Sequence, residues 1–284
     1  MPELPEVEVV RRGLDRHVVG RTFTAVEVLH PRAVRGNTHD LAAVLPGTTI
    51  TGTGRRGKFM WFTLDCADAL VIHLRMSGQM LVGAPGSVDS PHLRIRALLG
   101  GSGRDSAVAG EPLELDFVDQ RTFGLWQYAP FSGDVPEPVA HIAPDPFEDD
   151  FDAVATARLI RTKRSAIKTV LLNQEVVSGI GSIYADEAMW AAGVRPSKSA
   201  RSLRQRDTIA LLDHARDVMA RALEQGGTSF DSLYVNVNGA SGYFSRSLNA
   251  YGQAGAPCAR CGTPIERMVV GGRSSFYCPQ CQRG

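Results

Sequence analysis

The sequence predicts an α+β chain with two domains. The first is an N-terminal antiparallel β-sandwich with a leading helix, and the second is a helical domain that ends in a cysteine-bearing β-hairpin. Three observations lead to this prediction. Apolar residues follow short, strand-like runs from residue 22 to about 128 and a helical period after residue 152. A proline-rich, acidic stretch separates the two patterns, and two close pairs of cysteines end the chain.

Length and composition exclude several classes of protein. The chain has 284 residues, of which 43% are hydrophobic and 21% charged, so it can bury a core and is neither a disordered tail nor a coiled coil. No apolar run is long enough to cross a bilayer, and the N-terminus lacks the basic and apolar regions of a secretory signal. We therefore expect a cytoplasmic protein with no membrane partner.

Residues 1–130 are expected to form the β-sandwich domain. A helix is predicted over residues 3–19, because Pro5 suits a first turn and Gly20 is a typical stop. Its apolar residues recur three and four apart, at Val7, Val10, Leu14 and Val18. Strand-like runs follow from residue 22 to about 128; examples are Thr22–Leu29, Lys58–Leu64, Ala69–Leu74, Leu93–Leu99 and Leu113–Val118. The Gly/Ser/Asp-rich segment 100–112 is predicted to be an exposed hairpin loop.

Residues 131–151 are predicted to be a linker, residues 152–252 a helical domain and residues 253–284 the terminal hairpin. Five of the sixteen prolines lie between Pro130 and Pro146, and an acidic cluster follows them. Four segments then have a helical period: 152–161, 165–174, 182–192 and 203–225. Gly226-Gly227 indicates where the last of these helices ends.

Charge is unevenly distributed along the chain. Residues 1–155 carry 14 Lys/Arg and 21 Asp/Glu, a net charge of −7, whereas residues 156–284 carry 17 and 9, a net charge of +8. A basic half favours a polyanionic partner such as nucleic acid, although an uneven surface without a ligand gives the same count.

Four of the five cysteines form the pattern C-x2-C-x16-C-x2-C, at Cys258, Cys261, Cys278 and Cys281. Two close pairs joined by a hairpin-length loop are typical of a four-thiolate tetrahedral zinc site, with Gly271-Gly272 placed to turn the hairpin. Two disulfides are the alternative, which the missing secretory signal disfavours. The fifth cysteine, Cys66, has no sequence partner.

The N-terminal sequence Met-Pro-Glu offers a possible nucleophile. Removal of Met1 would expose Pro2 as a secondary amine, and an α-amino group titrates near neutral pH. Such an amine can attack a carbonyl-type carbon and form an iminium, with Glu3 beside it to move protons. Taken alone, Pro2 and Glu3 can equally be ordinary first-turn residues of a helix.

Several short motifs follow one another along the chain: Pro2–Glu6, Arg56–Lys58, His73–Gly78, Asp119–Gly124, Gly179–Glu187, Gln225–Thr228, Gly242–Phe244 and Arg273–Cys278. Through these motifs the chain resembles the bacterial formamidopyrimidine-DNA glycosylase family over essentially its whole length. Each motif is weak alone, and their order and spacing together are specific. The resemblance implies a helix–two-turn–helix around Gly179–Tyr184 and one structural zinc ion on the terminal hairpin.

The resemblance also implies a function. The chain would be a monomeric glycosylase and AP lyase that excises 8-oxoguanine and formamidopyrimidines from double-stranded DNA in base excision repair. Pro2 would attack C1′ of the damaged nucleotide and Glu3 would be its acid/base partner, with β- and δ-elimination to follow. Lys58 would hold the phosphate near the lesion, and Arg273 would bind phosphate and assist δ-elimination.

Further site residues are implied by the same resemblance. Met76, Arg121 and Phe123 would fill the space left by an extruded nucleotide, although the two apolar residues could instead belong to the core. The other expected DNA contacts are His73, His92, Arg164, Lys168, Ser182 and Tyr243, and the expected lesion contacts are Glu6, Thr228 and Ser229. Ser182 stands where the family usually has asparagine. A glycine-rich entry to a helix at Gly179–Tyr184 is expected to present free N–H groups to phosphate.

Two other functions are consistent with parts of the pattern. One is an oxidised-pyrimidine glycosylase of the endonuclease VIII type, which Met76 and the Arg121/Phe123 pair disfavour. The other is a non-catalytic zinc-ribbon DNA-binding protein, which the presence of Pro2, Glu3 and Lys58 disfavours.

Overall fold

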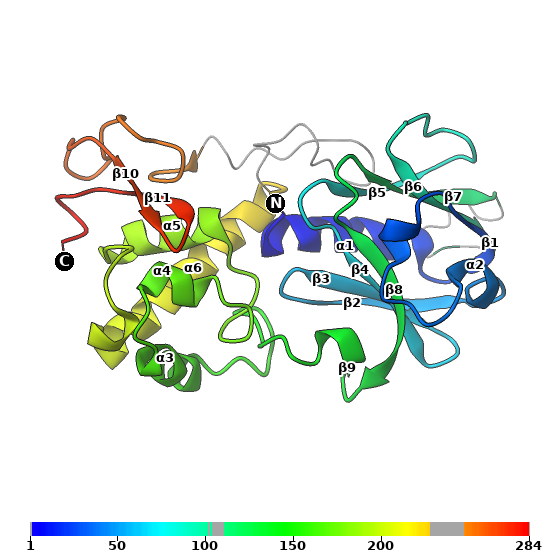
Figure 1. Ribbon diagram of the computed structural model, residues 1–284, viewed down its shortest axis with the longest axis horizontal. Helices are drawn as coiled ribbons and strands as arrows, with labels where there is room; N and C mark the ends of the chain where they lie inside the picture. Colours follow the sequence, from blue (N-terminus) through cyan, green and yellow to red (C-terminus); the bar gives the residue numbers. More distant parts are fainter. Residues whose placement is uncertain (1, 102, 104–110, 228–246, 284) are drawn as a thin grey trace. The chain divides into compact units, whose positions relative to one another are not determined.

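A computed structural model describes residues 2–101, 103, 111–227 and 247–283, which divide into two compact units. Unit 1 comprises Pro2, Glu6–Ala140 and residues 226–227. Unit 2 comprises Glu3–Pro5, residues 141–225 and residues 247–283. Figure 1 labels the helices and strands of both units.

Unit 1 contains two antiparallel sheets and most of the first helix, α1 (Leu4–Val18). One sheet has four strands in the order β1-β6-β7-β5, and the other has five strands in the order β2-β3-β4-β8-β9. Their bounds are β1 Thr22–Val28, β2 Ile50–Arg56, β3 Phe59–Leu64, β4 Asp68–His73, β5 Gly78–Gly83, β6 Leu93–Gly100, β7 Leu113–Asp119, β8 Leu125–Ser132 and β9 Val135–Pro136. Short helical turns complete the unit: η1 Pro31–Val34, α2 Leu41–Val44 and η3 Glu137–Val139.

The core of unit 1 joins the apolar face of α1 to both sheets. The four apolar residues predicted to share one face of this helix are all buried in the same cluster, together with Phe23 and Phe117 of one sheet and Phe62 of the other. The helix ends at Val18, and Gly20 has a φ of 93°, which glycine adopts without strain. The predicted leading helix is therefore confirmed.

Four strands of unit 1 were not singled out in the sequence: β2, β5, β8 and β9. β2 has the sequence ITGTGRR, whose glycines are typical of turns rather than strands. Gly54 pairs with Trp61 of β3, and a side chain at Gly54 would place Cβ 2.3 Å from the indole ring. The glycine is thus explained by close packing within a sheet. The predicted linker also differs, because β8 and β9 extend pairing as far as Pro136.

Unit 2 is helical, as predicted, and ends in a β-hairpin. Its elements are α3 Ala153–Thr162, α4 Ile167–Leu171, α5 Ser182–Ala192, η4 Ala200–Ser202, α6 Gln205–Glu224, β10 Glu266–Val270 and β11 Arg273–Tyr277. α5 packs along α6 in the core, where Tyr184, Met189 and Leu211 are fully buried. α6 is followed by Gly226 and Gly227, with φ values of 75° and 87°, which agrees with the predicted end of the helix.

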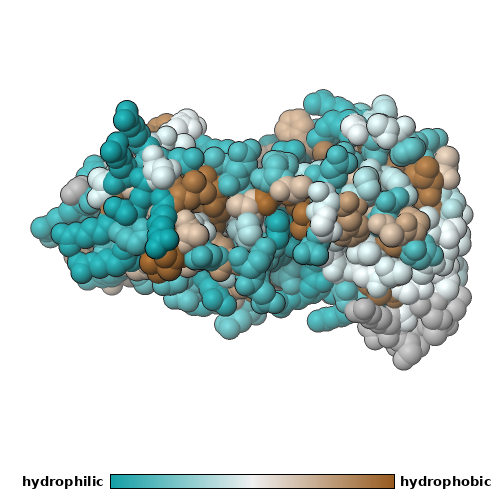
Figure 2. All heavy atoms as spheres, turned by 90° about the horizontal axis from the view of Figure 1, so that it is seen from below, coloured by the Kyte–Doolittle hydropathy of each residue, from teal (hydrophilic) through white to brown (hydrophobic). Residues whose placement is uncertain are grey.

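The two hairpin strands are antiparallel and turn at Gly271-Gly272, as the sequence predicts. β11 contacts α5, and the hairpin lies beside that helix in Figure 1. On the face of the molecule in Figure 2, hydrophilic residues predominate and hydrophobic residues form small separate groups. Among the described residues, no helix is both long and apolar enough to span a bilayer.

Candidate functional site

The carboxyl group of Glu3 caps the N-terminus of α5. Its oxygens accept hydrogen bonds from the backbone N–H groups of Gly181 (2.8 Å), Ile183 (3.0 Å) and Tyr184 (3.3 Å). These N–H groups have no partner within the helix itself, and a carboxylate also interacts favourably with the positive end of the helix dipole. Glu3 is 3% exposed, so it occupies a fixed, buried position one residue from Pro2.

The two glycines of the Gly179-Ile180-Gly181 motif make room for the N-terminal segment. A side chain at Gly181 would place Cβ 2.2 Å from the carboxyl carbon of Glu3, and one at Gly179 would place it 2.4 Å from Leu4. Gly179 also has a φ of 85°. The prediction that this turn presents its N–H groups to DNA phosphate is therefore wrong for three of them, because Glu3 occupies them.

Lys168 was predicted to contact DNA, and this prediction is wrong. The side chain is fully buried, and its ammonium group lies 2.8 Å from Asp186 and 2.6 Å from the carbonyl oxygen of Ser274. Four of the eight residues from 161 to 168 are basic, and the resemblance placed Lys168 among the cations near DNA. Arg164, in contrast, is exposed and remains a possible phosphate contact, while Ser182 is half-buried at the first position of α5.

Four predicted site residues are buried in unit 1: Pro2, Glu6, Lys58 and His73. Lys58 follows the Arg56-Gly57 turn between β2 and β3 and is 6% exposed. Glu6 faces Gly227, where a Cβ would lie 3.3 Å from its Cγ. Burial, together with the charges of Arg75 and Lys58, lowers the pKa of His73 to about 3, so the ring is neutral at pH 7.

His73 and His92, both predicted phosphate contacts, have different surroundings. The Nδ1 atom of His73 accepts the Arg75 N–H at 2.9 Å, and its neutral ring packs edge-on against Phe59. Because Nδ1 is the acceptor, the neutral ring carries its proton on Nε2 and can donate it, so the predicted phosphate contact of His73 stays a prediction. His92 is half-buried and lies 3.3 Å from Arg94.

Met76, Arg121 and Phe123 are exposed on two neighbouring turns of unit 1, as insertion into DNA requires. Met76 is 37% exposed between β4 and β5, and Phe123 is 41% exposed between β7 and β8. Asp119 joins these turns: its carboxylate accepts hydrogen bonds from the Ser77 hydroxyl and from the Arg121 N–H. The alternative that Met76 and Phe123 belong to the core is excluded.

The same two turns contain strained backbone. Arg75 and Thr122 have φ values of 53° and 54°, in the left-handed region that non-glycine residues rarely adopt. The backbone of the second turn is held from outside by Arg35, whose guanidinium donates to the carbonyl oxygens of Phe123 and Gly124. Strain that is held in place by such bonds is common where a protein presents side chains to a ligand.

The four cysteines of the terminal hairpin form one cluster. Their sulfur atoms all lie within 4.8 Å of one another. Four sulfur ligands at this spacing fit a tetrahedral zinc ion, which would have no open coordination position for catalysis. Arg273, the first residue of β11, is exposed on the same hairpin.

Trp190 of α5 supports this cluster. Its indole N–H donates a 3.4 Å hydrogen bond to the sulfur of Cys258, and the guanidinium of Arg260 lies 3.8 Å from the ring centroid. Burial opposes ionisation of Cys258, but this bond and backbone N–H groups lower the pKa of its thiol to about 6. A thiolate is the form that binds zinc.

Glu187, next to Asp186 on α5, holds the segment 249–251. Its carboxylate accepts hydrogen bonds from the backbone N–H groups of Asn249, Ala250 and Tyr251, the shortest at 2.7 Å. The predicted contacts Thr228, Ser229 and Tyr243 lie outside the described residues.

Four supporting residues were not predicted as site residues: Ser77, Asp119, Asp186 and Glu187. All lie inside motifs that the sequence displays, so motif membership was an available signal. Their partners are distant in sequence, as in the 42-residue separation of Ser77 and Asp119, and sequence spacing alone gives no indication of such pairs.

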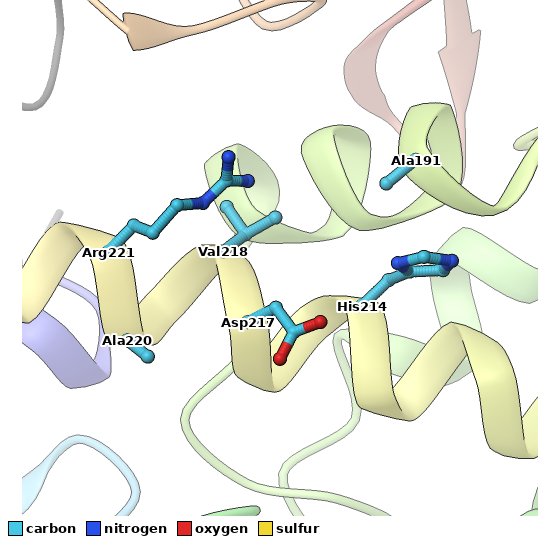
Figure 3. A pocket seen from close by; sticks show the side chains of 6 residues that line it. All are labelled: Ala191, His214, Asp217, Val218, Ala220 and Arg221. Carbon is cyan, nitrogen blue, oxygen red and sulfur yellow. The ribbon is translucent and has the colours of Figure 1, made fainter.

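A surface hollow of 530 Å³ lies outside this site (Figure 3). Ala191 of α5 and five residues of α6 line it: His214, Asp217, Val218, Ala220 and Arg221. None of the predicted site residues that the structure describes lines it.

Models of three protein domains match the chain. The formamidopyrimidine-DNA glycosylase N-terminal domain matches residues 1–126, the H2TH domain of the same enzyme matches residues 142–233, and a zinc finger found in FPG and IleRS matches residues 255–284.

Full-length relatives carry the same name. The chain is 57% identical over 298 residues to a formamidopyrimidine-DNA glycosylase of Corynebacterium jeikeium, with 100% of each chain covered. It is 56% identical over 289 residues to that of Mycolicibacterium smegmatis, covering 99% of this chain and 97% of the relative.

Solved structures of protein–DNA complexes have the same fold. Fpg of Lactococcus lactis in complex with abasic-site DNA is 30% identical, with a TM-score of 0.85 over 99% of this chain and 100% of that one. MutM in complex with DNA containing carbocyclic 8-oxo-G is 31% identical, with a TM-score of 0.85 over all of both chains.

Proposed function

This chain belongs to the formamidopyrimidine-DNA glycosylase family and is a DNA glycosylase of base excision repair, and from that premise we propose that it excises oxidised purines with a Pro2 nucleophile. The substrates are 8-oxoguanine and formamidopyrimidines in double-stranded DNA. Related solved structures hold abasic-site and 8-oxo-G DNA, which supports this choice of lesions.

Pro2 and Glu3 carry out base release. After removal of Met1, the neutral Pro2 amine attacks C1′ of the damaged nucleotide, and the bond from C1′ to the base breaks. Glu3 supplies and takes up the protons of this exchange. The buried cap that Glu3 forms on α5 supports this role, because three hydrogen bonds fix the carboxyl group beside the nucleophile without help from substrate.

The C1′–O4′ bond of the sugar then breaks, O4′ takes up a proton, and the nitrogen lone pair of Pro2 completes the covalent iminium from which strand cleavage follows. The iminium acidifies the C2′ proton, so its removal expels the 3′ phosphate, and a second elimination expels the 5′ phosphate. Lys58 holds the phosphate beside the lesion and offsets the charge that develops on it. Arg273, exposed at the start of β11, binds phosphate and assists the second elimination. The product is a one-nucleotide gap with phosphates at both ends.

The extruded nucleotide leaves a gap in the base stack, which Met76, Arg121 and Phe123 fill. Arg121 donates to the orphaned cytosine, while Phe123 wedges between bases. The observation that carries the proposal is the joint exposure of these three side chains on turns that Asp119 fixes in place. Met76 on the first turn and the Arg121/Phe123 pair on the second both support a purine-lesion enzyme over one of the endonuclease VIII type.

One experiment tests the proposal against both alternatives. Purified protein is incubated with duplexes that carry a single 8-oxoguanine opposite cytosine, or a single oxidised pyrimidine. We expect release of 8-oxoguanine and a gap with two terminal phosphates. Faster excision of the oxidised pyrimidine would support the endonuclease VIII type, and binding without cleavage would support the non-catalytic protein. We further propose that the enzyme acts as a monomer in the cytoplasm, which light scattering of the free and DNA-bound protein tests for oligomeric state.

A further inference from the structure

The interior of unit 2 contains an ion pair that the proposed reaction does not use. Lys168 of α4 and Asp186 of α5 are both 0% exposed, and their charged groups lie 2.8 Å apart. Burying two charges is costly, and an apolar pair of similar size commonly gives equal or greater stability. Stability alone is therefore a weak explanation for this pair.

Both members of the pair bind the hairpin strand β11. Lys168 donates to the carbonyl oxygen of Ser274 at 2.6 Å. Asp186 accepts from the hydroxyl of Ser275 at 2.6 Å and from the backbone N–H of Phe276 at 3.0 Å. Three consecutive residues of the strand are thus held against the helices.

Arg273 lies immediately before these three residues and is exposed. Burial lowers the pKa of the Lys168 ammonium, and the positive charge of Arg273 lowers it by a smaller amount, so Arg273 lies near Lys168. Asp186 raises that pKa, which shows that the carboxylate stabilises the buried ammonium. The ion pair and the exposed guanidinium therefore belong to one local arrangement.

We propose that Asp186 is a positioning residue for Arg273: it fixes the start of β11, with Lys168 as its buried counterion and second contact to the strand. The inference rests on the proposed function, because the role of Arg273 on phosphate is part of that proposal. The zinc cluster folds the hairpin, whereas the ion pair sets where the folded hairpin lies on α4 and α5.

The first measurement needs no DNA. Asp186→Ala is compared with Asp186→Asn, which keeps the size of the side chain. The control is Asp217→Asn, which changes an exposed carboxylate on α6. We expect Asp186→Ala to retain one zinc ion per chain. The protection factor of the Phe276 amide against hydrogen exchange should fall at least tenfold. The Asp217→Asn control should match the parent protein. If Asp186→Ala does not fold, Asp186→Asn combined with Lys168→Met removes both charges and takes its place.

The second measurement is a double-mutant cycle on affinity for a duplex with a stable abasic analogue. Asp186→Ala should weaken binding about tenfold in the parent protein and leave it unchanged in an Arg273→Ala background, because its effect passes through Arg273. Equal losses in both backgrounds, loss of zinc, or unchanged exchange at Phe276 would each overturn the inference. Failure of the parent protein to cleave lesion DNA would instead overturn the proposed function. The hydrogen-exchange result would remain valid, because it is measured without DNA.

Discussion

The hydroxyl of Ser77 donates a 2.5 Å hydrogen bond to the carboxylate of Asp119. This bond joins the turn that presents Met76 to the turn that presents Arg121 and Phe123. Asp119 also accepts the N–H groups of Arg121 and Gly124, so one fully buried carboxylate organises both turns. The three side chains that would enter DNA are therefore supported as a group.

Ser77→Ala tests this arrangement. Removal of the hydroxyl leaves Asp119 short of one donor, which should cost about 1 kcal/mol of stability. The larger effect should be on discrimination between opposite bases, because the role proposed for Arg121 in reading the base opposite the lesion requires a fixed geometry. We expect the ratio of single-turnover excision rates opposite cytosine and adenine to fall several-fold. Ser132→Ala, at an exposed serine of β8, is the control. An unchanged ratio would show that the Ser77–Asp119 bond has no part in base reading.

A pH-dependent prediction concerns two carboxyl groups on β7. Burial and the neighbouring Glu114 raise the pKa of Asp116 from 3.8 to about 7, although Arg96 opposes this. Because the pKa in the folded protein lies above that of the unfolded chain, stability from this group is complete below pH 3.8 and is lost as pH rises towards 7.

Asp116→Asn should therefore stabilise unit 1 at pH 8 and change little at pH 4. At pH 8 we expect an increase in Tm of about 3 °C or more, measured by thermal unfolding. Asp89→Asn, an exposed change in the same unit, provides the control. A lower Tm for Asp116→Asn at pH 8 would show that the ionised carboxylate stabilises this site through Arg96.

The sequence predicts much of the fold because its signals are local. The face of α1, the end of α6 and the cysteine spacing each depend on residues within a few turns of one another, and all three are confirmed. The strand β2 was missed because Gly54 is required by Trp61 of the next strand, a contact across the sheet. Strand propensity depends only on the residue types within the segment, whereas the indole ring comes from a different strand.

The errors in the site have the same physical origin. Gly179-Ile180-Gly181 was correctly singled out, but its N–H groups bind a carboxyl group 178 residues away along the chain rather than a phosphate. Lys168 belongs to a basic run in the sequence, yet its partner Asp186 is on another helix. Residue type and spacing identify such positions. Only the packing of distant segments shows what each one binds.

The hairpin should depend on zinc, while unit 1 should not. All four thiols lie between residues 258 and 281. We expect chelation to weaken DNA binding and strand incision and to leave the β-rich unit folded, as measured by circular dichroism and thermal unfolding. Trp190 should report metal loss by a change in fluorescence, because it donates to Cys258. Trp190→Phe should lose this signal. A single transition that unfolds the whole protein on chelation would contradict the prediction.

The last prediction concerns Pro2, on which the proposed reaction depends. Borohydride present during the reaction should reduce the iminium to a stable amine and join protein to lesion DNA covalently. Pro2→Gly should weaken this trapping, because a primary amine replaces a secondary one, and a blocked N-terminus should abolish base excision. Glu3→Gln should lose base excision yet retain cleavage of a pre-formed abasic site, since an aldehyde needs less acid assistance than a glycosidic bond.

Lys58 is the competing amine, and one comparison separates the two assignments. If Pro2 is the nucleophile, a Lys58→Ala variant with a free terminus should still be trapped on abasic DNA, whereas a protein with a blocked terminus should not. Intact mass measured beforehand establishes that Met1 has been removed from the first protein and that the block is present in the second. Trapping of the blocked protein together with loss of trapping in Lys58→Ala would assign the nucleophile to Lys58. The buried position of Glu3 on α5 would then need a role other than proton transfer to and from Pro2.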